Sequence, residues 1–499
     1  MATPTDTRNS NGPNLTSIPL EVLLQITSNL TTPEYGNLRR TCKHIEETLF
    51  SSFAREFFTK RQFMLTEFSL QALVKISKSR LSSSLKHVIF GLERPAMKPP
   101  LIGQTREYVK ENRARQEYMD HMSLLYTNRD GEMLTETFAN LRNLATVGIR
   151  DFYSHSRNRD YPLTAWKSYG ASTYELETGL RLDSPLRWNG QNHKFLLDQA
   201  EYCSRMFFIL FYSLGKAGSR PKDFEAILRH SSLYDHAFNL PKYTDAIVQP
   251  VLDNLRILLL DLSAEAAPFY INVHDVPTAC PNYLLRTFLS RLPALEHLRL
   301  NFRFYEGDQT SNLLSWLSQP IPAGPSNTTT ATLLPDSPSP IEFAKLSRLD
   351  IGMVTVEPEI LIDIIGKHRA TLRILNLHKL SLLQKDPTKS SRGNLWANFL
   401  AQLSKLDLKL TGLKLSELSQ KSQRNRKIYF ITFKDSRTGF GRVREWGGTN
   451  VQSCLKDFIA NLVVEGVDKD AESSDEESID EDMYDLEDES EISEISSSL

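Results

Sequence analysis

The chain has 499 residues, more than the roughly 250–300 at which one compact core stops growing, so the sequence predicts several domains or an elongated repeat array. Its 59 basic and 61 acidic residues nearly cancel, and its four widely separated cysteines exclude a disulfide framework and favour a reducing compartment. The longest apolar runs fall far short of the roughly 20 residues that span a bilayer, and the polar residues 1–14 predict a disordered leader without a secretory signal. These features exclude a membrane or secreted protein and predict a cytoplasmic or nuclear one.

The first ordered segment is unusually apolar. Seven of the nine residues of Ile18–Ile26 are apolar, more than the stripe of about 100° that a helix needs to pack on its own domain. Thr32 predicts the start of a second helix, with Pro33 and Glu34 in its first turn, and a third helix is predicted to begin near Glu46. Three helices of this size cannot bury the whole apolar surface among themselves, so the surplus predicts a partner.

The same residues resemble an F-box. The resemblance lies in Ile18-Pro19-x-Glu21-Val22-Leu23-x-x-Ile26, in Leu30, in Pro33-x-x-x-x-Leu38 and in Arg40-x-Cys42-Lys43-x-Ile45. It implies a three-helix module at residues 15–62 that docks on the Skp adaptor of SCF ubiquitin ligases and, through it, on cullin. It further implies that the adaptor is bound by Pro19, Leu20, Leu23, Leu24, Ile26, Leu38, Cys42 and Ile45.

Two departures from the F-box pattern weaken the expected docking. Gly36 stands where the family often has a second aliphatic residue, and the aromatic residue common near Ile45 is absent. The stretch that follows, "LFSSFAREFFTKRQFMLTEFSLQALVKIS", resembles the corresponding segment of filamentous-fungal F-box proteins of similar length.

The rest of the chain, residues 63–464, carries an irregular repeat. The pattern L-x-x-L-x-[LI] predicts a short strand, and amphipathic helical stretches lie between its copies. This is the arrangement of a leucine-rich-repeat-like α/β solenoid, so the fold class predicted is α/β, with the F-box followed by an irregular solenoid. The strict copies begin at Leu255, Leu295, Leu346, Leu372 and Leu403, and the looser ones at Leu85 and Leu144.

Several segments interrupt the repeat. The Pro-, Ser- and Thr-rich residues 318–340 predict a disordered insertion, and the charged residues 104–122 predict a surface helix. Near the end, residues 427–435 alternate like a strand, residues 442–446 are predicted to return as a hairpin, and residues 454–465 predict a closing helix.

The solenoid predicts a polar surface for a substrate. Residues between the apolar pair of each strand face away from the core, and stacked strands align them. We expect them to form one concave, mainly basic strip that binds an acidic or phosphorylated protein. The strip consists of His297, Arg299, Asn301, Arg348, Asp350, Asn376, His378, Lys405, Asp407 and Lys409. A solvated sheet face without a ligand is the alternative.

No catalytic or cofactor-binding motif is present in the sequence. Gly439-Phe440-Gly441 lacks the third glycine of a phosphate loop, and the directions of Cys42 and His44 diverge on a short helix. We therefore expect neither an enzyme nor a bound cofactor or metal. The basic residues are dispersed, so nucleic-acid binding is not favoured.

The acidic tail, residues 465–499, has sixteen acidic residues and one basic residue, which leaves the remainder of the chain with an excess of positive charge. The composition predicts disorder. Association of the tail with the basic body, or with a basic partner, is the alternative. Taken together, the sequence predicts a substrate-recognition subunit of an SCF ubiquitin ligase. The alternative is a non-catalytic scaffold that uses the F-box without promoting ubiquitination.

Overall fold

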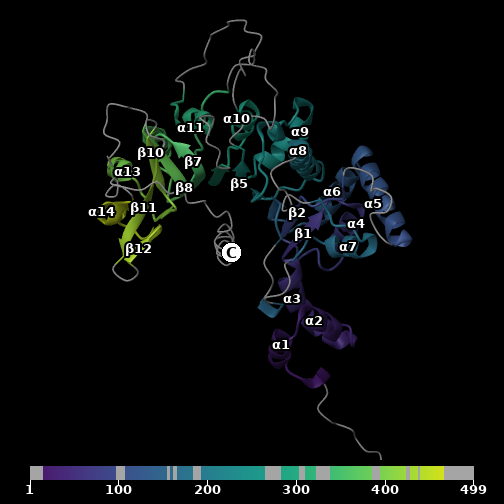
Figure 1. Ribbon diagram of the computed structural model, residues 1–499. Coiled ribbons are helices and arrows are strands. Elements are labelled where there is room, and N and C mark those ends of the chain that lie inside the picture. The colour runs from purple at the N-terminus through teal and green to yellow at the C-terminus, as the bar shows by residue number, and fades with distance from the viewer. Residues whose placement is uncertain are drawn as a thin grey trace, which may run out of the picture.

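The computed structural model describes residues 15–96, 107–153, 158–160, 166–183, 193–263, 282–302, 310–321, 338–384, 394–422, 427–435 and 439–465. Three N-terminal helices project from one end of a curved sheet, and the remaining helices follow the outer side of the curve (Figure 1). The predicted α/β fold class, N-terminal helices followed by a solenoid-like body of parallel strands, is confirmed. The predicted leader and tail, and residues 322–337 of the predicted insertion, lie outside the described residues.

The N-terminal module consists of the 3-10 turn η1 (Leu15–Ser17) and the helices α1 (Leu20–Ser28), α2 (Thr32–Arg39) and α3 (Lys43–Phe58). The N-cap of α2 is Thr31, not the predicted Thr32, and the backbone N–H of Thr31 donates to Glu34 Oε2 over 2.9 Å. Helix α3 also begins three residues before the predicted Glu46. The small core of this module contains Leu23, Tyr35, Ile45, Leu49 and Phe57.

The body is built on strands that pair in the order in which they occur in the sequence. Strands β1 to β9 form one parallel ladder, each hydrogen-bonded to its predecessor. A parallel pairing of neighbours in sequence requires a crossover between them, and the helices supply it on the convex side. The strands are β1 (Lys60–Met64), β2 (His87–Gly91), β3 (Thr146–Arg150), β4 (Asp223–Ile227), β5 (Ile257–Leu262), β6 (His297–Phe302), β7 (Arg348–Val356), β8 (Ile374–Gln384) and β9 (Gly412–Ser416).

The helices follow the convex side and contact neighbouring helices there, as α4 contacts α6, α6 contacts α8 and α12 contacts α13. The charged surface helix predicted near residues 104–122 is α5, which begins four residues later. The helices are α4 (Glu67–Ser77), α5 (Tyr108–Tyr126), α6 (Arg129–Asn140), α7 (Ala171–Thr178), α8 (His193–Lys216), α9 (Asp245–Leu252), α10 (Tyr283–Leu289), α11 (Thr310–Ser318), α12 (Pro358–Lys367), α13 (Leu395–Leu403) and α14 (Val451–Asn461).

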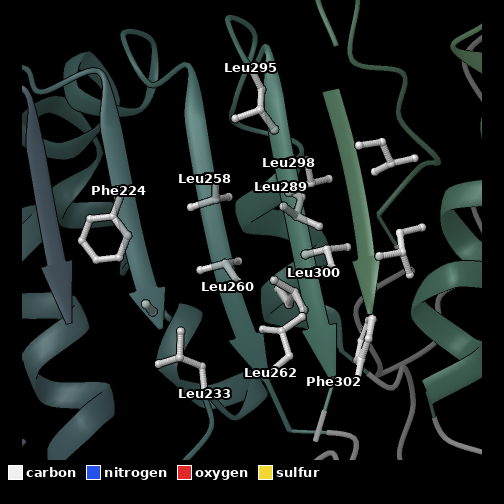
Figure 2. Close-up of a cluster of buried hydrophobic side chains, with 14 of the residues drawn as sticks. Phe224, Leu233, Leu258, Leu260, Leu262, Leu289, Leu295, Leu298, Leu300 and Phe302 are labelled. Carbon is white, nitrogen blue, oxygen red and sulfur yellow. The ribbon is translucent and has the colours of Figure 1, made fainter. Parts of the chain in front are cut away.

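The core lies between the strands and these helices. Two apolar side chains from each strand point into it and align with the pairs of the neighbouring strands, such as Leu258 and Leu260 beside Leu298 and Leu300 (Figure 2). Each repeat buries its apolar pair only because another repeat stacks on it, which is why the leucine pattern recurs.

One predicted strand is wrong. The copy that begins at Leu403 is the last turn of α13 and the loop after it, and Asp407 in that loop has a left-handed backbone with φ of 49°. The ladder instead continues at β9, where Leu413 and Leu415 enter the core. Lys405, Asp407 and Lys409 are therefore not part of the concave sheet face, and Lys414 and Ser416 hold the positions that we assigned to them.

The C-terminal end caps the sheet. Strand β10 (Ser419–Ser422) pairs with β8, and β11 (Ile428–Asp435) pairs with β10, with β12 (Gly439–Gly441) and with β14 (Leu462–Val464). The predicted strand is β11, and the predicted closing helix is α14, which begins at Val451 and ends at Asn461; the last residues predicted as helix instead form β14. The predicted hairpin return is wrong in its partner, because β13 (Val443–Gly447) pairs with β9 and it is β12 that folds back on β11.

Candidate functional site: an exposed helix face and a polar sheet face

The first candidate surface lies on α1. Leu23 is buried in the module core at 2% exposure, and the apolar side chains on either side of it along the helix surface are exposed: Leu20 at 44%, Val22 at 45% and Ile26 at 37%. At about 100° per residue, Leu20 lies about 60° from Leu23 on one side of the helix, and Ile26 and Val22 lie about 60° and 100° from it on the other side. We name Leu20, Val22 and Ile26, on these two flanks of the buried Leu23, the α1 apolar surface. It is the part of the apolar excess that no described segment of the chain covers.

The structure divides the predicted adaptor-binding residues into three groups. Pro19, Leu20, Ile26 and Cys42 are exposed. Leu24 and Leu38 are half-buried and pack on the module core, whereas Leu23 and Ile45 belong to that core. Leu23 and Ile45 therefore support the surface from beneath, and Val22, which was not among the predicted residues, is part of it.

A segment from the body holds the module in place. Arg159, in the 3-10 turn η2 (Asn158–Asp160), donates to both carboxylate oxygens of Glu56 on α3 over 2.6 and 2.8 Å. The same guanidinium donates to the backbone carbonyls of Thr27 and Leu30, at 2.7 Å each, where α1 ends. Because helix ends leave carbonyls without partners, one arginine satisfies the end of α1 and fixes it to α3.

The next residue of η2, Asp160, binds the start of α2. Asp160 Oδ1 accepts from the backbone N–H of Thr32, at the start of α2, over 2.9 Å, and its other carboxylate oxygen accepts from the Thr32 hydroxyl. Trp166 stacks on Phe57 with ring centroids 5.8 Å apart. We name Arg159, Asp160 and Trp166 the clamp. No motif in the sequence indicated it, because its partners lie more than 100 residues away.

The second candidate surface is the concave face of the sheet. The structure brings His297, Arg299, Asn301, Arg348, Asp350, Asn376 and His378 together on adjacent strands, as predicted. It does not make them a freely exposed basic strip, because His297, Arg299 and Asp350 are buried.

Carboxylates pair with the basic residues of this face. His297 Nε2 lies 2.7 Å from Asp350 Oδ2, and Arg348 Nε donates to both oxygens of Asp350 at 3.1 Å. Burial by itself raises the pKa of Asp350, but His297 and Arg348 outweigh it and hold that pKa below its usual value. Arg299 Nη2 lies 3.6 Å from Asp261 Oδ1 in the same way.

A second buried group lies further along the sheet. Glu225 Oε1 on β4 is 3.0 Å from His87 Nε2 on β2 and 3.2 Å from Arg150 Nη2 on β3. Gly148 lies on the strand between them, and a Cβ there would come within 2.7 Å of Glu225 Cγ. The missing side chain lets Glu225 cross β3. Despite its burial, Glu225 has a strongly lowered pKa because His87 and Arg150 stabilise the carboxylate.

Half-exposed side chains occur along the concave face, for example His87, Asp223 and Asp261, and one group of them lies at its C-terminal end. Arg348, Asn376, His378 and Lys414 are half-buried and lie on the successive strands β7, β8 and β9. A partner would meet this group, which we name the concave end, before it met the buried pairs. Glu225 and Asp261 were not among the predicted residues: β4 carries no leucine copy, and Asp261 lies just beyond the apolar pair of the copy that begins at Leu255.

Metal and membrane sites were also considered. Among the residues that the structure describes, no three His, Cys, Asp or Glu side chains gather as metal ligands. Within the same residues, no helix combines the length and the apolar character needed to cross a bilayer.

Comparison with known proteins agrees with the N-terminal geometry. The family model of the F-box domain matches residues 15–51, which cover η1, α1, α2 and the first half of α3. F-box domains bind the Skp adaptor in SCF complexes, and the proteins that carry them generally act as non-catalytic adaptors for substrates. No curated protein matches the chain.

Proposed function

We propose that this chain is the substrate-recognition subunit of an SCF-type ubiquitin ligase, with residues 15–62 as the docking module and residues 63–464 as the binding body. The observation that carries the proposal is the F-box match at residues 15–51 together with an uncovered apolar surface on α1. Exposed apolar side chains on both flanks of this helix are the groups that a partner of the module would cover.

The mechanism is positional. The α1 apolar surface docks on the Skp adaptor and through it on cullin, while the body holds a protein substrate at raised effective concentration near the ubiquitin-conjugating enzyme. The clamp supports this role, because two domains joined only by a flexible linker would not hold a fixed distance between adaptor and substrate.

The concave end is the substrate surface that we favour. Arg348 and Lys414 are half-exposed cations, and Asn376 lies on the strand between them. This chemistry suits an acidic or phosphorylated peptide, since arginine binds carboxylate and phosphate through two parallel hydrogen bonds. Arg299 is unsuitable as a contact, because it is buried beside Asp261.

The test is affinity purification of the full chain followed by a ubiquitination assay of the captured proteins. We expect Skp and cullin to copurify and a bound protein to become ubiquitinated. Exchange of Lys414 for Glu together with Asn376 for Asp should remove that protein and retain Skp. Retention of Skp without ubiquitination of any captured protein would favour the scaffold function instead. Loss of both partners in the wild type would refute the proposal.

A further inference from the structure

The last strands carry an exposed surface that no described segment covers. Ile428 and Phe430 on β11 are 46% and 42% exposed, and Phe440 on β12 is 61% exposed. Directly paired residues of neighbouring strands lie on the same face, and the ladder pairs Lys421 with Ile428 and Lys434 with Phe440. Arg442 joins them, with its guanidinium 4.9 Å from the centre of the Phe430 ring.

This surface alternates apolar and cationic side chains. We name Lys421, Ile428, Phe430, Lys434, Phe440 and Arg442 the C-terminal patch. A cluster of exposed apolar side chains rimmed by polar groups is typical of an interaction site. The charge selects an anionic partner, and the rings select one that also carries apolar side chains.

The first residue of the acidic tail, Glu465, lies at the edge of the C-terminal patch. The backbone N–H of Glu465, the last described residue, donates to the Phe430 carbonyl over 2.9 Å. The Glu465 carboxylate lies 3.8 Å from Arg442 Nη2. The other terminal nitrogen of Arg442, Nη1, lies 3.7 Å from Glu417 Oε2. The first residue of the acidic tail is thus already an ion-pair partner of the patch.

The remaining tail has the complementary composition. Residues 479–486, "IDEDMYDL", interleave four carboxylates with Ile479, Met483, Tyr484 and Leu486. Ile479 follows Glu465 by fourteen positions, which span up to about 45 Å when extended, so the segment can reach the patch. Tethering of this kind gives an effective concentration in the millimolar range, enough to populate a weak contact.

We propose that residues 479–486 dock on the C-terminal patch of the same chain, with their carboxylates beside Lys421, Lys434 and Arg442 and their apolar side chains on Phe430 and Phe440. The contact is independent of adaptor docking. It makes the patch a site for acidic, partly apolar peptides, which the tail occupies until a competing ligand of the same chemistry displaces it.

Zero-length cross-linking of lysine to carboxylate in the full-length chain tests the contact, with the linked peptides identified by mass spectrometry. We expect Lys421 and Lys434 to link to Asp480, Glu481, Asp482 or Asp485 within one chain, independently of protein concentration. Both lysines remain as reporters in Arg442→Glu and in Phe440→Ser. Reversal of Arg442 should reduce these links about fivefold, since one exposed ion pair changes an equilibrium about two- to fivefold and the new charge repels the tail.

Arg256→Glu is the matched control. Arg256 is 49% exposed and pairs with Glu296, much as the 42% exposed Arg442 pairs with Glu417, but it lies away from the patch. It should leave the links unchanged, and Phe440→Ser should reduce them at least about threefold while the melting temperature stays that of the wild type. Links spread over the lysines of the body in proportion to exposure, or links that form only between two chains, would overturn the proposal.

Discussion

The repeat body buries its apolar residues in its own core, whereas the F-box module leaves part of them exposed. In the body, Leu258, Leu298 and Leu349 stack strand on strand and are at most 2% exposed. In the module, Leu20, Val22 and Ile26 are each more than a third exposed, although they lie in an equally apolar run. The difference shows that an apolar pattern locates an interface only where the chain supplies no repeat to cover it.

The charged residues of the two regions also differ. In the body they form buried pairs within the sheet, such as His297 with Asp350. At the module, the pair of Arg159 with Glu56 connects the module to the body. The buried charges of the concave face therefore stabilise the sheet, and only its half-exposed side chains can bind a partner.

The largest expected effect comes from the body core. Leu298→Ala should lower the free energy of unfolding by about 3–5 kcal/mol, because a fully buried leucine is deleted between two neighbouring strands and leaves a cavity. Chemical denaturation measures the loss. Leu176→Ala, at a residue that is 75% exposed on α7, is the control and should change stability by less than about 0.5 kcal/mol. A loss that small for Leu298 would contradict the stacked core.

The second prediction concerns adaptor binding. Leu20, Val22 and Ile26 still expose enough surface for about 1 kcal/mol each on docking, so replacing all three by Ala should weaken Skp binding about a hundredfold. Calorimetric titration with Skp measures this. The melting temperature should stay unchanged, because none of the three lies in the module core. Val109→Ala, at a residue that is 77% exposed on α5, should bind normally, and equal affinity of the triple variant would refute the α1 apolar surface.

The clamp provides the third prediction. Arg159→Ala removes the guanidinium that binds the Glu56 carboxylate and two backbone carbonyls at the end of α1, at a cost of about 2–3 kcal/mol. Hydrogen exchange of α1 and α2 should accelerate while exchange of the β5–β8 strands stays slow. Arg159→Lys should regain little of this protection from exchange, since lysine cannot bind a carboxylate through two parallel hydrogen bonds. Unchanged exchange in α1 would show that the module stands without the clamp.

The smallest effect is a change of pH dependence in the body. Burial raises the pKa of Glu93 from 4.5 to about 7. Between these two values the folded state holds a proton that the unfolded state has released, so stability falls as pH rises from about 4.5 to about 7. Glu93→Gln should flatten this slope by at most about 1.4 kcal/mol per pH unit, measured by denaturation at several pH values. The exposed change Glu107→Gln should not alter it, and a wild-type slope retained in Glu93→Gln would exclude this carboxyl as its source.

Sequence predicted the architecture better than the surfaces. The leucine copies located β2, β3, β5, β6, β7 and β8, because each strand must bury two alternating side chains in a shared core. Strand β4 was missed, since Phe224 and Ala226 do not fit a leucine pattern. Strand β9 was displaced because two strict copies follow each other there: Leu403-Leu406-Leu408, which runs from the end of α13 into a loop, and Leu410-Leu413-Leu415, which leads into β9. Leucine spacing fits both copies equally, so it cannot tell which of them forms the strand.

The polar surfaces were harder to predict from the sequence, for a physical reason. Whether Arg299 is a contact or a buried ion pair depends on Asp261, which lies on a different strand. The same holds for His297 and Asp350, which are 53 residues apart. Burial and pairing are properties of the stacked sheet, so a single repeat read by itself shows a basic residue and no partner.

The clamp also has a consequence for the order in which the chain acquires its structure during synthesis. Arg159 follows its partner Glu56 by 103 residues, so α1, α2 and α3 leave the ribosome long before the group that joins them. At about 5–20 residues per second, the helices wait on the order of 5–20 s for it. During that interval the apolar face of α1 is accessible while the module is incompletely fastened. A nascent chain bound early by its adaptor would be protected during these seconds, whereas one without an adaptor would expose the same leucines to chaperones and proteases.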